Sequence, residues 1–600
     1  MTEVQRWASR ARPLWERTDT SVNERQLARW TDVLGSRELL ARRMRSARRT
    51  TATQDDWIQV LRRALARRGT ASIDDVFATD THADRVPFGH AFAPFIRYAH
   101  RRLTARASVA RAVLSAEAVR ALEDELLEHL GLLASLALGR RFYDLRFSRA
   151  PLAALEDIWA NQPPSTTIYR PFVSHLLEGG WREVFETYPV LARLIAQSIQ
   201  QWIENTGRVC QRLHADLPRL RKTFGALDLP VVSVSSGLSD RHNHGQSVVR
   251  FTFSNGRHLI YKPRSVKPEG VFNRALQWLN RKDLTLKLAT VRSLDRGYYG
   301  WMEFVPYRDC GDIAKVSRFY QRAGALLALL HAFGVSDIHY ENLIASGEHP
   351  VIIDLETLLA ERRGTVMDTG FLPRPSSTKE HAADASALGA SVEQDAGLRF
   401  PMWRHINTDQ MSLVEGAPGE VEQHRVRLDG DVARAVDRVP ELKAGFREAY
   451  RILLRHRREL ASAPFVRALD DLDLRILVRD SATYGQLHLH LLYPEHLEDG
   501  VDRSIELEWL ARPLCIRSVP SPGRIAVYEH ERDAMERLDL PLFTTKIWRR
   551  MRHDPATQEA RAFGSPRDAN ALRQRLAQLS ESDCRRQLAA ITRAFNRPAR

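Results

Sequence analysis

The stretch DIHYENLIASGEHPVIIDLET, residues 337–357, decides the fold. Two short apolar runs in it alternate with charged and amide side chains: Asp337 and Asn342 lie five residues apart, and Asp354 directly follows the run VII. An apolar, β-branched run of this length indicates a short strand. An aspartate, an asparagine five residues later and a second aspartate after a strand are the order in which protein kinases place the residue beside the attacking hydroxyl and the two magnesium ligands.

The upstream segment supplies the other parts of a phosphoryl-transfer site. The motif IYKPRS, residues 260–265, places Lys262 at the end of an expected strand, and the chain has no lysine before residue 222. The segment YYGWMEFVPY, residues 298–307, has the pattern of a strand and a hinge, so that the backbone around Phe304 is available to the edge of an adenine. Together with the first stretch, these segments predict an ATP site in which the lysine holds the phosphates and Mg²⁺ is bound.

Each of these signals also has an ordinary structural explanation. The spacing D-x-x-x-x-N is common, an Asp after an apolar strand is often a turn residue, and a lysine at a strand end is usually solvated. Three independent parts, in the expected order and within one kinase-sized interval, favour the catalytic interpretation.

Two features differ from an ordinary protein kinase. No G-x-G-x-x-G loop precedes the lysine; the polar segment SDRHNHGQSVVRF, residues 239–251, stands there, with Asp240 and His242 two residues apart. His339 and Glu356 add further acid and base groups, and Glu356 is also a candidate metal ligand. The histidines are candidates for proton transfer near the phosphates, unless they only form local hydrogen bonds.

The spacing of apolar residues divides the chain. Residues 110–136 and 188–213 repeat apolar side chains every three or four positions, which indicates helices, whereas β-branched alternation begins near residue 227 and Asn255-Gly256 marks a hairpin turn. These patterns predict an α+β fold with a small antiparallel sheet lobe and a helical lobe. The expected regions are helical N-terminal (1–220), sheet lobe (221–308), helical lobe (309–470) with an irregular, activation-like loop (360–425), and C-terminal elimination motif with further helices (471–600).

Composition argues against several classes of protein. The four cysteines among 600 residues are too scattered for a disulfide framework or a zinc site, which fits a reducing cytosol. No run approaches the roughly 20 apolar residues of a membrane helix, and the N-terminus lacks the apolar core of a secretion signal. The net charge of +15 comes mostly from arginines, and no nucleic-acid-binding motif accompanies them. We expect a cytoplasmic protein that binds neither membrane nor nucleic acid.

Taken together, the motifs resemble the dehydratase region of class II lanthipeptide synthetases, the LanM enzymes. The resemblance rests on SDRHNHGQSV, YKPRS, YGWMEFV, the 337–357 stretch and RILVRDSATYGQLHLHLLYPEHLEDGVDR, residues 475–503, and it extends from about residue 120 to about residue 550. It implies a lipid-kinase-like two-lobed core with a large N-terminal helical region and C-terminal helical additions. It also implies phosphorylation of Ser and Thr in a ribosomally made precursor peptide, followed by elimination of phosphate to leave dehydroalanine or dehydrobutyrine.

The resemblance assigns a role to each site residue. Lys262 corresponds to the residue that holds the ATP phosphates, Asp337 to the one that orients or deprotonates the substrate hydroxyl, and Asn342 and Asp354 to magnesium ligands. The family's further active-site positions are matched by Asp240, His242, His339 and Glu356.

The elimination pattern of the family, R-x-x-x-R-x-T-x-x-Y, is matched with one change. Arg475, Arg479 and Tyr484 fit it, whereas Ser481 stands in place of the threonine and offers the same hydroxyl donor and acceptor. A guanidinium group can hold a departing phosphate through two hydrogen bonds. We therefore expect Arg475 and Ser481 to serve elimination.

LanM enzymes usually also carry a cyclase that binds zinc. This sequence stops near the end of the dehydratase resemblance and Cys584 has no Cys or His partner after it, so we expect neither zinc nor thioether formation in this chain. A separate cyclase or other tailoring enzyme, another use of the dehydroamino acids, and a longer natural protein all stay open.

Two alternatives to a peptide dehydratase also stay open. A kinase for a peptide or small molecule that stops at phosphorylation is kept in view by Ser481. A non-catalytic protein could use the same fold to bind the leader of a precursor peptide, but such a protein has no need of a complete set of phosphate and metal ligands.

Overall fold

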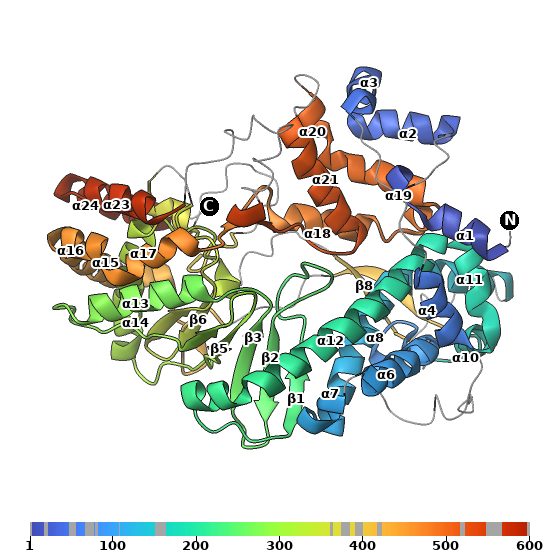
Figure 1. The fold of residues 1–600 in the computed structure, drawn as a ribbon, viewed down its shortest axis with the longest axis horizontal. Coiled ribbons are helices and arrows are strands. Elements are labelled where there is room, and N and C mark those ends of the chain that lie inside the picture. Colours follow the sequence, from blue (N-terminus) through green and yellow to red (C-terminus); the bar gives the residue numbers. More distant parts are fainter. Residues whose placement is uncertain are drawn as a thin grey trace.

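The computed structural model of the protein describes residues 3–16, 22–46, 56–66, 77, 82–106, 108–149, 164–360, 364–373, 384–389, 400–416, 423–516, 522–547 and 567–596. Within these ranges the fold is mixed α+β, mostly helical with one five-stranded antiparallel sheet (Figure 1). The expectation of a small antiparallel sheet in an α+β fold is therefore confirmed. Among the helices of these ranges, none is long and apolar enough to cross a membrane.

Helices make up most of the described chain up to residue 224. They are α1 (Glu3–Ala11), α2 (Glu24–Leu34), α3 (Arg37–Ser46), α4 (Asp56–Leu65), α6 (Ala93–Arg106), α7 (Ser108–Val113), α8 (Ala116–Arg149), α10 (Tyr169–His175), α11 (Trp181–Thr187) and α12 (Pro189–Phe224). The periodic segments 110–136 and 188–213 fall in α7 and α8 and in α12, as predicted. Helix α12 begins with Pro189, whose fixed φ suits a first turn, and ends before Gly225, whose φ of +93° favours glycine.

The sheet has the strand order β1-β2-β3-β5-β4, and each neighbouring pair is antiparallel. Its strands are β1 (Val231–Ser235), β2 (Val249–Phe253), β3 (His258–Lys262), β4 (Ser293–Asp295) and β5 (Gly300–Glu303). The turn at Asn255-Gly256 joins β2 to β3, and Gly256 has a φ of +76°, which explains the preference for glycine there. Helix α13 (Lys267–Asn280) connects β3 to β4.

The two faces of the sheet meet different surroundings, because successive side chains of a strand point to opposite faces. Phe251, Tyr261 and Trp301 are buried against α8 and α12. Ile260 and Met302 lie on the other face, which borders the cleft described below. The long helix α12 therefore supports the sheet from behind, and the front stays available for a ligand.

The rest of the described chain is again mainly helical. Its helices are α14 (Ile313–Ala332), α15 (Val439–Arg455), α16 (Arg457–Ser462), α17 (Pro464–Arg467), α18 (Ser481–His490), α19 (Gly500–Leu507), α20 (Arg512–Cys515), α21 (Pro522–Glu536), α23 (Ala569–Gln578) and α24 (Glu581–Phe595). Its strands form hairpins or short pairs: β6 (Leu343–Ser346) with β7 (His349–Ile352), β8 (Phe400–Arg404) with β9 (Ser412–Gly416), β10 (Arg427–Leu428) with β11 (Asp431–Val432), and β12 (Arg475–Ile476) with β13 (Phe543–Thr544).

Helices α14 and α15 cross so closely that their backbones are in contact. A Cβ atom added to Gly324 would lie 1.9 Å from the carbonyl oxygen of Leu442, and one added to Gly445 would lie 1.8 Å from that of Gln321. Glycine is therefore required on both helices for this crossing. The crossing carries the largest apolar core of the described chain, to which α13 also contributes.

The helices after residue 471 contribute to two main cores. Leu491 and Ile505, from the α18–α19 part, are buried together with Trp30 of α2. Leu572 of α23 and Ile591 of α24 instead join the core of α14 and α15. In Figure 1, α23 and α24 lie at the far left of the molecule, whereas α18 lies near its centre and α19 to the right of it.

The segment expected to be an irregular, activation-like loop, residues 360–425, is described only in part. Its described residues include a 3₁₀ turn, Val366–Thr369, and the β8–β9 hairpin. Trp403 of β8 packs against Gly139 of α8, where an added Cβ would lie 2.5 Å from the indole ring. The parts of the expected loop at 361–363, 374–383, 390–399 and 417–422 lie outside the described residues.

Candidate active site

A cleft of about 490 Å³ opens on the front of the sheet, a volume typical of small-molecule sites. Side chains from the sheet, the 238–248 loop, the β6–β7 hairpin and β12 line it. Ten of the eleven residues that the sequence singled out are on its wall: Asp240, His242, Lys262, Phe304, Asp337, His339, Asn342, Asp354, Glu356 and Arg475.

The β6–β7 hairpin brings the two expected metal ligands together. Leu343 pairs with Ile352, and one step outward the Ile353 N–H donates to the carbonyl oxygen of Asn342 at 3.0 Å. Asn342 and Asp354 therefore lie at the same open end of the hairpin, although twelve residues separate them. The alternation of this stretch, apolar runs inside and polar groups at the ends, explains the local fold.

Asp337 stands before the hairpin in a left-handed backbone conformation, with a φ of +63°. Its carbonyl oxygen accepts a hydrogen bond of 2.9 Å from Nδ2 of Asn342, which leaves the amide oxygen of Asn342 to act as an acceptor or ligand. Non-glycine residues in this conformation are uncommon and gather at functional sites. This hydrogen bond fixes the positions of Asp337 and Asn342 relative to each other.

Lys262, at the end of β3, reaches across to this hairpin. Its Nζ donates to the carbonyl oxygen of Ile353 at 2.7 Å, to Asp354 at 2.9 Å and to Glu269 at 3.2 Å. The side chain is almost completely buried, so these contacts compensate its charge. Lys262 and Asp354, 92 residues apart in sequence, therefore meet at one point of the cleft.

Two charged residues of this network were missed by sequence reasoning. Glu269 lies in the first turn of α13, and Arg264 follows Lys262 within the motif YKPRS. Arg264 Nη2 lies 2.6 Å from both Glu269 and Asp354, and its Nε lies 3.1 Å from Glu356. The one signal in the sequence was an acidic residue, Glu269, seven positions after the strand-end lysine. Linear spacing does not show which charged side chains turn into the interior.

The network alternates three cations with three carboxylates: Lys262, Arg264 and Arg475 with Glu269, Asp354 and Glu356. Burial alone would raise the pKa of Asp354, but the charges of Arg264 and Lys262 outweigh it and hold that pKa well below its ordinary value. The pKa of Glu269 is lowered in the same way, with burial opposed by the same two cations. Both acids are therefore ionised at neutral pH.

These residues fit a magnesium ion. Mg²⁺ prefers hard oxygen ligands, usually one or two carboxylates together with waters and substrate phosphates. Asp354 supplies an ionised carboxylate, Asn342 supplies an amide oxygen, and Glu356 lies beside them on the same wall. The neighbouring Lys262 could hold phosphate oxygens, so the arrangement is suited to a metal–phosphate ligand.

The loop that contains Asp240 and His242 is anchored from the C-terminal part of the chain. The carboxylate of Asp539 accepts the N–H groups of His244 and Gly245, each at 2.7 Å. His242 Nδ1 donates to the carbonyl oxygen of Leu540 at 2.7 Å, which leaves Nε2 as the basic nitrogen. Sequence reasoning did not find Asp539, because 295 residues separate it from His244.

The charge state of His242 is set by its surroundings. Burial lowers its pKa, and the positive charge of Arg475 lowers the pKa further, while Glu356 and Asp240 oppose this effect more weakly. The imidazole is therefore neutral at neutral pH. A neutral imidazole with a free Nε2 beside an arginine can accept a proton.

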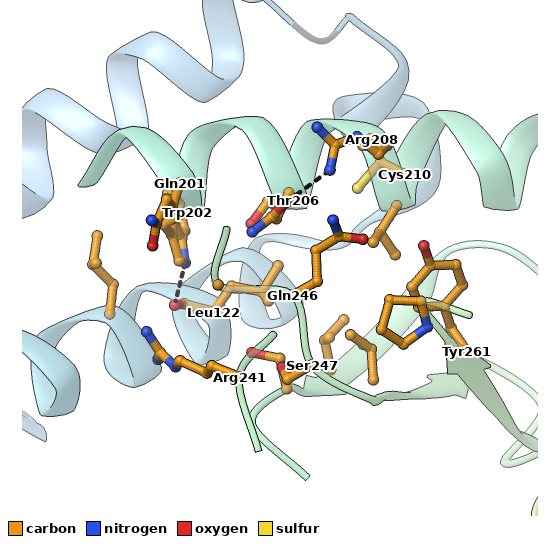
Figure 2. A pocket seen from close by; sticks show the side chains of 18 of the residues that line it. Leu122, Gln201, Trp202, Thr206, Arg208, Cys210, Arg241, Gln246, Ser247 and Tyr261 are labelled. Carbon is orange, nitrogen blue, oxygen red and sulfur yellow. Dashed lines mark hydrogen bonds between the residues drawn. The ribbon is translucent and has the colours of Figure 1, made fainter. Parts of the chain in front are cut away.

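A second, small cavity of about 70 Å³ lies behind the same loop. Figure 2 shows Arg241, Gln246 and Ser247 of the loop on one side of it and side chains of α12 on the other. Asn205 of α12 also donates to the carbonyl oxygen of His244 at 2.8 Å. Helix α12 thus holds the loop from behind, while Asp240 and His242 face the cleft.

The elimination pattern is split by the structure. Arg475 begins β12, its N–H donates to the carbonyl oxygen of Glu356 at 2.8 Å, and its guanidinium group pairs with the Glu356 carboxylate. Arg479 and the hydroxyl of Tyr484 both bind the buried Glu531 at 2.6 Å. These two residues thus stabilise the fold in this structure, whereas Arg475 reaches the cleft.

Ser481 is the predicted residue that the structure does not bring to the cleft. It is exposed, begins α18 directly after the N-cap Asp480, and is not among the residues that line the cleft. Its part in elimination stays a prediction.

His339 and Phe304 lie at the edges of the cleft. His339 Nδ1 accepts the N–H of Glu341 at 3.3 Å, and its backbone pairs with Ser386. Phe304 directly follows β5, and its ring centroid lies 4.8 Å from that of His258. The adenine contact expected for the backbone near Phe304 stays a prediction.

Outside the cleft, one cluster in the described part of the chain has the side chains of a metal site. His490, His496 and Glu506 bring ligand atoms within 4.8 Å of one another. However, Arg29 donates to both oxygens of Glu506, at 2.6 and 3.1 Å, and His490 lies 3.1 Å from the second oxygen. The carboxylate is therefore already engaged in an ion-pair network that ties α2 to α19.

A match to a known protein family covers all residues that line the cleft. A family model described as "Domain of unknown function (DUF4135)" matches residues 188–546, from α12 through the whole cleft to β13. The chain is also 23% identical over 335 residues to "Lacticin 481/lactococcin biosynthesis protein LcnDR2" of Lactococcus lactis subsp. lactis, a distant relation that covers 51% of this chain and 36% of that protein. The chain thus spans well under half the length of this curated relative. Because the family match covers more than half of its residues, the protein belongs to the DUF4135 family.

Proposed function

We propose that the protein is an ATP- and magnesium-dependent dehydratase, which phosphorylates Ser and Thr of a precursor peptide in lanthipeptide-type biosynthesis and then eliminates the phosphate. The observation that carries the proposal is that Lys262, Asp337, Asn342 and Asp354 share one cleft with Arg475. The distant relation to a lacticin biosynthesis protein supports a peptide as the substrate. In this proposal a nucleotide-binding lobe, built from the sheet and α13, faces a helical lobe around α14 and α15, as in a kinase-like core.

The first step needs a held triphosphate and an oriented hydroxyl. Lys262 would hold the phosphates, and Asn342 and Asp354 would bind magnesium, whose charge supports transfer of the γ-phosphoryl group. Asp337 would accept the proton of the substrate hydroxyl while the hydroxyl oxygen forms a bond to the γ-phosphorus, the bond from that phosphorus to the bridging oxygen breaks, and ADP leaves. The left-handed backbone at Asp337 and the Asn342 hydrogen bond to its carbonyl group fix this residue in place.

The second step removes phosphate from the phosphorylated residue. A base takes the proton from Cα, the C–H electrons form the Cα=Cβ bond, and the Cβ–O bond breaks so that phosphate leaves with its electron pair. His242 is suited to the base because it is neutral with Nε2 free. Arg475 would stabilise the charge of the departing phosphate.

One observation favours a second candidate, a peptide kinase that stops at phosphorylation. Ser481, the residue expected to support elimination, is exposed and does not line the cleft. In that case Arg475 would only position Glu356.

The two candidates are separated by the intact mass of the cognate precursor peptide after incubation with the protein, ATP and magnesium. Loss of one water per modified residue supports the dehydratase, and stable gain of phosphoryl groups supports the kinase. Asp337→Asn should abolish both changes, whereas Arg475→Ala should accumulate phosphopeptide. Unchanged modification by Asp337→Asn would contradict the proposed role of this cleft.

A further inference from the structure

We propose that Arg264 is a second phosphate-binding residue of the cleft, which acts with Arg475 on the phosphate that leaves during elimination. The proposal rests on the dehydratase function proposed above and extends it. It names a group that the motif comparison did not assign and that the tertiary contacts alone reveal.

Arg264 and Arg475 share one carboxylate. Nε of Arg264 lies 3.1 Å from Oε2 of Glu356, and the guanidinium group of Arg475 pairs with Oε1 of the same residue. Two guanidinium groups on the two oxygens of one carboxylate flank the same small space. Both side chains line the cleft and are partly accessible, 22% for Arg264 and 16% for Arg475.

A phosphate that binds Arg264 must replace some of the present hydrogen-bond partners of its guanidinium group. Its donors are taken by Glu269, Asp354, Glu356 and the carbonyl oxygen of Ser265. One of these partners, Asp354, is the carboxylate that the proposed function assigns to magnesium. When its oxygens serve a metal, Arg264 loses an anionic partner on its cleft side and keeps Glu269 behind it.

A phosphate monoester is the ligand that fits such a pair of arginines. It offers three anionic oxygens, and each guanidinium group can donate two parallel hydrogen bonds to it. The charge on these oxygens grows while the Cβ–O bond breaks, so that donors on both sides stabilise the departure of phosphate. A lysine presents its charge from one point and lacks this fork, which makes Arg→Lys a selective test.

The test measures binding and elimination separately. The probe is a fluorescently labelled copy of the precursor peptide with one modified serine replaced by phosphoserine, compared with the unphosphorylated peptide by fluorescence anisotropy in magnesium buffer without ATP. The wild type should prefer the phosphopeptide, and Arg264→Lys and Arg475→Lys should each lower this preference about tenfold. The same two variants should convert the phosphopeptide to product about tenfold more slowly, while phosphorylation of the unmodified peptide falls much less.

A matched control is Arg318→Lys on α14, because Arg318 also pairs with a carboxylate, Glu348, but outside the cleft. This variant should retain the wild-type preference. Thermal unfolding of each variant checks that the fold is kept. If Arg264→Lys leaves preference and elimination unchanged, or slows phosphorylation as much as elimination, the proposal is wrong.

A second variant keeps the test decisive if Arg264→Lys does not fold. Glu356→Gln neutralises the carboxylate that the two arginines share, so affinity for the phosphopeptide should rise relative to the unphosphorylated peptide. An unchanged or weaker preference contradicts the proposal. If the wild type neither modifies the precursor with ATP nor prefers the phosphopeptide, the proposed function itself fails; if it dehydrates normally and only the Arg264 result is negative, the dehydratase stands.

Discussion

At the scale of single residues, His242 is the group whose chemistry depends most directly on its environment. Burial and the charge of Arg475 lower its pKa, so the neutral, proton-accepting form persists to lower pH than in a free histidine, whose pKa is about 6.5. When the pH is lowered from about 8, elimination from a phosphopeptide should therefore fall to half of its rate only below about pH 6.5. The rate of phosphate release, measured at a series of pH values, tests this expectation.

The control for this dependence is His242→Gln, which keeps a polar side chain but cannot act as the base. Its residual rate should be low and should lack the acid limb that is seen in the wild type. A wild-type rate that is already halved near pH 6.5 would show that the active base has an ordinary histidine pKa, contrary to the lowered value at His242.

The charged residues of the cleft show how far a sequence can be interpreted at this scale. The structure brings Lys262, Asp337, Asn342 and Asp354 into one cleft, and the order of the motifs in the sequence already links these residues. Arg264 was not singled out, although it contacts three acids. Its side chain turns inward only because the hairpin and α13 place carboxylates around it. The amino-acid sequence alone does not show this arrangement.

At the scale of elements, the loop before β2 depends on one distant side chain. Asp539 is buried and accepts two backbone N–H groups of the loop, so Asp539→Asn should remove one strong acceptor and cost about 1–3 kcal/mol of unfolding free energy. Hydrogen exchange should increase in residues 238–249 before other parts of the sheet. Asp431→Asn, at an exposed position in β11, is the control and should leave exchange in the loop unchanged. Unaltered exchange in Asp539→Asn would show that other contacts suffice.

The α14–α15 crossing is the second element whose sequence requirement can be tested. Gly445→Ala places a methyl group against the backbone oxygen of Gln321, which no rotamer change relieves, so we expect a loss of at least about 3 kcal/mol in chemical denaturation. Gly207→Ala in α12 is a matched control, because no atom lies within 4 Å of the added Cβ. There the better helix propensity of alanine should stabilise by up to about 1 kcal/mol. Equal effects of the two changes would contradict the tight crossing.

At the scale of the whole molecule, buried ion pairs join the N- and C-terminal parts. Glu536 of α21 binds Arg193 of α12 at 2.7 Å and lies 3.7 Å from the fully buried Arg503. Glu536→Gln would leave both arginines without their shared counter-charge, and we expect a loss of about 3 kcal/mol in urea unfolding. Glu204→Gln, at an exposed position of α12, should leave the unfolding midpoint unchanged. A similar midpoint for both variants would mean that the buried pair is not stabilising.

The sequence by itself determined the parts of this protein that depend on neighbouring residues. Periodicity predicted α8 and α12, the Asn255-Gly256 turn predicted the β2–β3 hairpin, and the 337–357 motif predicted a site at one end of a strand. These features could be predicted because helix and strand periods and turn preferences act within about ten residues of chain.

Only the tertiary structure decided which distant groups meet. It placed Arg475 beside Glu356, Asp539 under the 238–248 loop and Arg264 among three acids, and it left Ser481 outside the cleft. It also divided the helices after residue 471 between two cores. The physical reason is that such contacts depend on how whole elements pack, since burial and charge compensation select one arrangement from many that local patterns equally allow.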